Sequence, residues 1–84
     1  MAKSGEHAGK AILEVVDNQL RDLTPPETKE TFDRLVGEGF APAEARRLIA
    51  CVVAGEIFGM LKNLKPYDED RFITALKKLP ELPE

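Results

Sequence analysis

The segment from Pro42 to Leu64 constrains the fold most, because it is a long apolar run with helical spacing between two prolines. Its apolar residues recur every three or four positions, which places them along one face of a helix. That stripe consists of Ala45, Ile49, Val52, Val53, Ile57, Met60 and Leu64. We therefore expect a long central helix around which the rest of the chain packs.

Three further segments show helical periodicity and carry recognisable start and stop residues. Their expected bounds are about 6–23, 24–37 and 68–79. Ser4 is the expected N-cap of the first, and Thr24 with Glu27 forms a capping-box pattern at the start of the second. Tyr67 and Phe72 have the spacing of a hydrophobic staple around the start of the fourth. The sequence predicts an all-α fold, a compact array of about four helices.

The length of 84 residues favours one domain over residues 1–84, with flexible ends at 1–5 and 80–84. Hydrophobic residues make up 43% of the chain and charged residues 32%, which is typical of a globular protein. The net charge of -3 argues against a protein that depends on phosphate contacts. Nucleic-acid binding through Arg46 and Arg47 therefore remains a weak hypothesis.

Glu56 is the polar residue that stands out, because it falls inside the apolar stripe of the third helix. One hypothesis makes it the centre of a small acid-dependent or metal-dependent site, with His7 and Glu14 as remote helpers. The other makes it a buried structural acid bonded to a backbone amide, to Gln19 or to an arginine. Gln19 favours the second hypothesis, since it too lies inside an apolar stripe.

The sequence contains few residues of the types that bind transition metals or act as strong nucleophiles. The chain has one histidine, His7, and one cysteine, Cys51, so we expect neither a metal site nor a cofactor. A lone cysteine cannot form an internal disulfide, and the first residues lack the apolar stretch of a secretory signal. No apolar run approaches the length of a membrane span. These features favour a reducing cytosol.

A second apolar face lies opposite the main stripe of the third helix. It contains Cys51, Gly55, Phe58 and Gly59, and a glycine pair with this spacing often allows another helix to approach closely. We expect the other three helices to cover the main stripe and a second chain to cover this face. The leading hypothesis is therefore a non-enzymatic protein-interaction module that associates through the third helix, with itself as a homodimer or with another protein.

The chain also resembles a small uncharacterised bacterial all-helical family, similar to the C-terminal half of a longer bacterial domain-of-unknown-function family. The matching residues are Gln19, Pro25-Pro26, Leu35, Gly39, Glu44-Ala45, Glu56, Pro66, Phe72, Leu76 and Leu79. The longer family has histidines at the positions of Ala11 and Arg46 here, besides the one matched by His7. The resemblance implies an all-helical fold and interest in Glu56, and it implies no activity.

A shorter likeness involves the turn after the second helix. Residues 35–40, Leu-Val-Gly-Glu-Gly-Phe, are similar to the helix–Gly-Phe–helix turn of ubiquitin-associated domains. That likeness implies peptide or protein binding at the Gly39-Phe40 corner.

Overall fold

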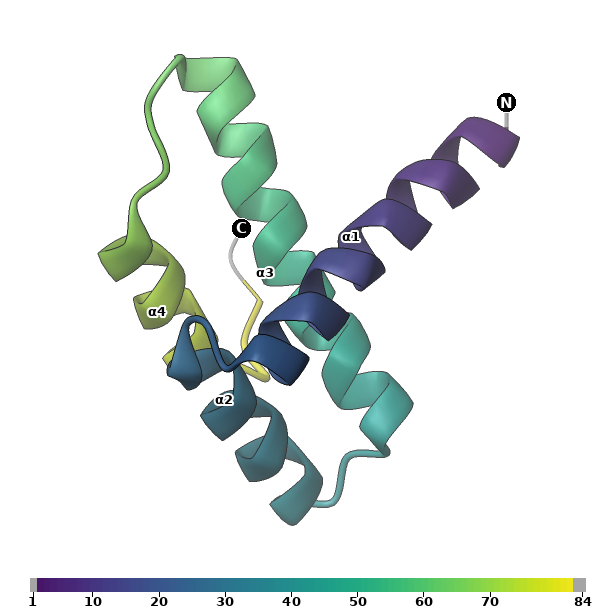
Figure 1. Cartoon of the computed structure of the whole chain (residues 1–84), viewed down its shortest axis with the longest axis vertical. Helices are drawn as coiled ribbons and strands as arrows, with labels where there is room; N and C mark the ends of the chain where they lie inside the picture. Colours follow the sequence, from purple (N-terminus) through teal and green to yellow (C-terminus); the bar gives the residue numbers. More distant parts are fainter. Residues whose placement is uncertain (1, 83–84) are drawn as a thin grey trace.

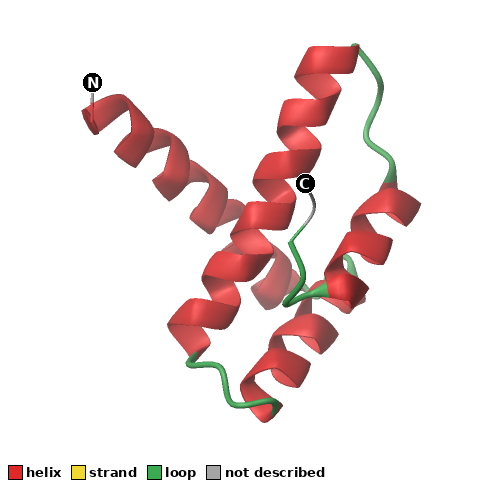
Figure 2. Cartoon of the chain, turned by 180° about the vertical axis from the view of Figure 1, so that it is seen from behind, coloured by secondary structure: helices red, strands yellow, loops and turns green. Residues whose placement is uncertain are grey.

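Residues 2–82 form four α-helices in the computed structural model, which describes side chains from residue 9 to residue 82. The helices are α1 (Ala2–Asp22), α2 (Pro26–Gly37), α3 (Pro42–Asn63) and α4 (Glu69–Lys78). Helix α3 contacts each of the other three, and α2 also contacts α1 and α4. The prediction of an all-α array around a long third helix is confirmed (Figure 1, Figure 2).

The end of α2 and the starts of α3 and α4 follow the predicted local signals. Gly39 has a φ of 107° in the turn after α2, a conformation that favours glycine. Ala41 caps α3 without a side-chain hydrogen bond, as expected for a residue that has no acceptor. The Asp68 carboxylate accepts the Arg71 N–H at the start of α4. The Tyr67 ring lies beside that of Phe72, 6.1 Å between centroids.

The predicted caps of α1 and α2 are wrong. Helix α1 begins at Ala2, so Ser4 lies within it and does not cap it. Pro25 occupies the N-cap position of α2, and the Thr24 hydroxyl instead donates back to the Asp22 carbonyl. Leu23 has a left-handed backbone, so α1 ends at Asp22, one residue before the expected bound. The Leu23 side chain, expected on the apolar face, is 54% exposed.

The core lies where α1, α2 and α4 meet the first half of α3. Its fully or nearly buried apolar residues are Val16, Leu35, Ala45, Ile49, Ala50, Val52, Val53, Phe72, Leu76 and Leu79. Arg34 on α2 also ties the core to α4, because its guanidinium donates to the Leu76 carbonyl at 3.1 Å. Burial of these side chains supplies most of the stability of a helical fold of this size.

The second half of α3 extends beyond this core, which corrects the expectation that the other helices cover its whole main stripe. Helix α3 has 22 residues against 12 in α2 and 10 in α4, so these two neighbours are too short to cover its whole length. Ile57 and Leu64, expected in the core, are 39% and 90% exposed. Figure 1 shows that this end of α3 extends beyond α2 and that α1 diverges from α3.

Candidate functional site

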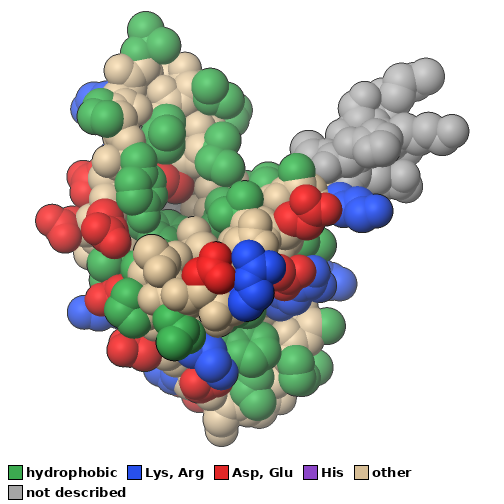
Figure 3. Space-filling view, viewed as in Figure 1, with side chains coloured by type: hydrophobic (Ala, Val, Ile, Leu, Met, Phe, Trp, Pro, Cys, Tyr) green, Lys and Arg blue, Asp and Glu red, His purple; other side chains and the backbone are tan. Residues whose placement is uncertain are grey.

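An exposed apolar patch covers the last turns of α3. It consists of Ile57, Phe58, Leu61 and Leu64, of which the last three are 66%, 72% and 90% exposed. Hydrophobic side chains gather over this projecting end of the molecule in Figure 3. Sequence reasoning named Phe58 but missed Leu61, and it assigned Leu64 to the core, because periodicity alone does not show where neighbouring helices stop.

All four residues predicted as an interface line one groove beside this patch. The groove has a volume of about 580 Å³ and runs between α3 and α4. Cys51, Gly55, Phe58 and Gly59 form its α3 wall, and Leu82 closes its far side. The C-terminal segment was expected to be flexible from residue 80; its described part, through Leu82, contributes to this groove.

No close packing contact within the chain accounts for Gly55 and Gly59. A Cβ added to either glycine would meet no heavy atom within 4 Å. Glycine inside a helix costs about 0.5–1 kcal/mol relative to alanine. No neighbouring helix of this fold requires either glycine, which leaves the backbone at this point accessible from outside.

Glu56 is a paired structural acid at the junction of α3 and α4. Its side chain is 9% exposed, and its two oxygens accept from the Arg71 guanidinium at 2.9 and 3.1 Å. The Asp68 backbone N–H donates to the same carboxylate at 3.3 Å. The Arg71 hydrogen bonds hold the pKa of Glu56 below its ordinary value despite the desolvation that raises it. A general acid needs the opposite shift, so this geometry favours the structural hypothesis.

Gln19 and Glu56 face the same small cavity but find different partners. The cavity measures about 210 Å³ and lies between α1 and α3, with Tyr67 and Phe72 closing it. The Gln19 side-chain oxygen accepts the Thr28 hydroxyl at 3.0 Å. Thr28 is fully buried, so this bond satisfies a hydroxyl that has no access to solvent. The backbone amide and the arginine, rather than Gln19, are the partners of Glu56.

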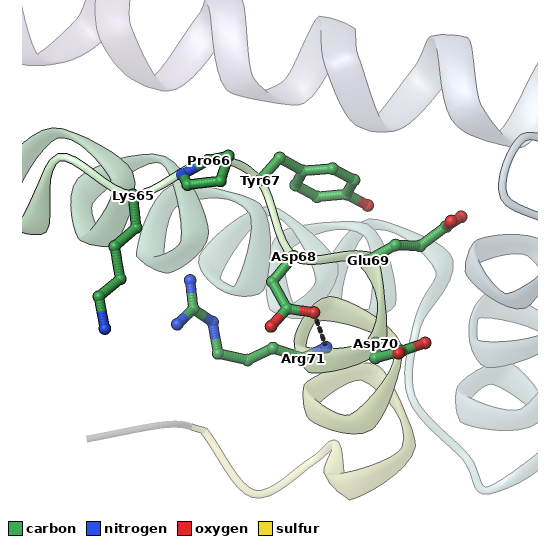
Figure 4. A pocket seen from close by; sticks show the side chains of 7 residues that line it. All are labelled: Lys65, Pro66, Tyr67, Asp68, Glu69, Asp70 and Arg71. Atoms are coloured by element: carbon green, nitrogen blue, oxygen red, sulfur yellow. Dashed lines mark hydrogen bonds between the residues drawn. The ribbon is translucent and has the colours of Figure 1, made fainter.

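An open hollow of about 510 Å³ surrounds the segment from Lys65 to Arg71. Figure 4 shows Tyr67 and Arg71 on opposite sides of the Asp68 backbone, with the Asp68 carboxylate against the Arg71 N–H. The Arg71 guanidinium is already engaged by Glu56. These contacts fix the start of α4.

Replacing Glu56 by glutamine tests its structural role. We expect a loss of about 1–2 kcal/mol at pH 7, since hydrogen bonds to a charged group contribute about 1.5–3 kcal/mol and Arg71 is half exposed. Because the pKa of Glu56 is lowered on folding, its contribution is complete above the unfolded value of about 4.3 and disappears as pH falls through the folded value. Urea unfolding at pH 3, 5 and 7 measures this dependence.

The control for this variant is Glu30→Gln, which changes an exposed carboxylate on α2 and should leave stability unchanged. An equal loss in Glu56→Gln at pH 3 and pH 7 would show that the ionised carboxylate is not what stabilises the junction.

The two arginines of the weak nucleic-acid hypothesis have different surroundings. Arg46 donates to both oxygens of Asp17 at 2.6 and 2.7 Å, which clamps α1 to α3 and lowers the pKa of Asp17. Arg47 is exposed on the outer side of α3. Because Asp17 offsets the charge of Arg46, this geometry does not favour the two arginines as a joint phosphate-binding patch.

The remaining candidates of the acid-or-metal hypothesis are not brought to Glu56. The His7 side chain lies outside the described residues, and Glu14 is exposed on α1. Among the side chains that the structure describes, no group of three or more histidine, cysteine or carboxylate residues could hold a metal ion. No helix in the described part of the chain is both long and apolar enough to cross a membrane.

Comparison with known proteins gives no match: no family model, no curated protein and no solved structure resembles the chain closely enough to be assigned. The resemblance to an uncharacterised bacterial family therefore stays a prediction, and the function is argued from the geometry alone.

Proposed function

We propose that this protein is a non-enzymatic interaction module that forms a homodimer through the outer side of α3. The observation that carries this proposal is the exposed apolar patch of Ile57, Phe58, Leu61 and Leu64. Side chains that pack in no core of their own chain lose nothing by being covered and gain the free energy of apolar burial. The open backbone at Gly55 and Gly59 supports a close approach on the same helix.

The size of the patch suits a weak, reversible dimer. Side chains of this size present on the order of 150–200 Å² each when fully exposed, so the four exposed fractions amount to roughly 450 Å². Two copies that bury the patch against each other would remove roughly 1,000 Å² with its rim, the lower limit for a specific interface. We expect a dissociation constant in the micromolar range. The protein would act in a reducing compartment, which keeps the exposed Cys51 thiol free.

The solution mass across a dilution series tests the proposal. Light scattering should give twice the monomer mass of 9.3 kDa at hundreds of micromolar and should approach 9.3 kDa at low micromolar concentration. A constant mass of one chain up to millimolar concentration would contradict self-association and leave the patch for a different protein.

A further inference from the structure

Four residues of α3 form a continuous seam on the side opposite the core. They are Cys51, Ala54, Phe58 and Leu61, separated by three, four and three residues. At about 100° of rotation per residue, they lie roughly half a turn away from Ile49, Val52 and Glu56. The spacing is the one by which two helices pack side by side in a coiled coil. In Figure 2, α3 lies in front of α1 with no other helix across it.

The order of side-chain sizes along the seam selects one direction of pairing. Its first two residues, Cys51 and Ala54, are small, and its last two, Phe58 and Leu61, are large and exposed. Two parallel copies would place large against large at one end and small against small at the other. Two antiparallel copies place each large side chain over a small one, which fills space evenly.

We infer that, in the dimer proposed above, a second copy of this chain packs antiparallel on the Cys51–Leu61 seam. Phe58 then lies over Ala54 of the other copy, and Leu61 lies over Cys51 of the other copy. The two-fold axis crosses the seam between Ala54 and Phe58. This inference rests on the proposed function, because it specifies how the second copy is oriented on α3; Phe58 and Leu61 are the two residues that the seam shares with the exposed patch.

Disulfide trapping tests the orientation. Antiparallel pairing separates the two Cys51 residues by about 15 Å along the helix axis, so mild oxidation of the native chain should give no covalent dimer. The Leu61→Cys chain should give a covalent dimer, since each new thiol faces Cys51 of the other copy. The double variant Cys51→Ser/Leu61→Cys should again give none, and Lys77→Cys, on exposed α4 surface, serves as a control for random collision.

Each outcome decides the inference. A covalent dimer that forms in the Leu61→Cys chain, and in neither the native chain nor the double variant, supports antiparallel pairing. A covalent dimer in the native chain, through two facing Cys51 residues, shows parallel pairing and overturns the inference while leaving dimerisation intact. A dimeric mass without trapping in any variant means that the seam is not the contact. A monomeric mass before oxidation removes the proposed function itself, which separates the two failures.

Discussion

The Phe58→Asp chain is expected to stay folded and to stay monomeric at concentrations where the native chain is a dimer. Phe58 is 66% exposed, so its replacement removes little packing within one chain. Burial of such a side chain contributes about 1.5–3 kcal/mol, and a symmetric dimer contains it twice. The dissociation constant should therefore rise by about two to four orders of magnitude. Light scattering and circular dichroism on the same samples measure association and folding.

A matched control for this variant is Leu23→Asp. Leu23 is similarly exposed at 54%, but it lies in the turn after α1 and outside the patch. Its backbone is left-handed, which aspartate tolerates better than leucine does. The control should dimerise as the native chain does. A folded Phe58→Asp chain with native affinity would show that the contact lies elsewhere.

The same leucine-to-alanine change should lower the free energy of unfolding strongly at Leu35 and hardly at all at Leu61. Leu35 is fully buried at the centre of the core, so its truncation should lower the free energy of unfolding by about 2–5 kcal/mol. Leu61 is 72% exposed, and its truncation should change the stability of the monomer by less than about 0.5 kcal/mol. An 84-residue domain is expected to have only about 4–13 kcal/mol in total, so the first variant should be severely weakened.

Both leucine variants are best measured in the Phe58→Asp background, because dimerisation adds concentration-dependent stability. Urea unfolding at two protein concentrations verifies that association is absent. Equal losses at Leu35 and Leu61 would contradict the account, since they would place the projecting end of α3 inside the cooperative core.

The helices were predictable because proline and glycine interrupt the chain at almost every boundary. Pro42 at the start of α3 and Gly39 in the turn before it require little knowledge of the rest of the fold. The errors at Ser4 and Thr24 have a common cause. A hydroxyl residue near a helix start can cap it, but the backbone decides whether it stands at the cap position, before it or inside the helix.

The candidate site was predictable only in part. Periodicity correctly placed Phe58 opposite the core face, but it placed Leu64 in the core because apolar spacing continues past the point where α2 and α4 end. The Arg71 partner of Glu56 could not be predicted, since it depends on how residues 64–68 return to α3. A helical face follows from local sequence, whereas its coverage depends on the lengths and paths of other segments.

The central claim is that the outer side of α3 is covered when two copies meet, and the alkylation rate of Cys51 tests it most directly. Cys51 is exposed in the single chain and lies at one end of the seam. Its rate should fall several-fold as protein concentration rises through the dissociation constant, and it should stay constant in Phe58→Asp. A constant rate in a native chain whose mass doubles would show that the copies meet on another surface.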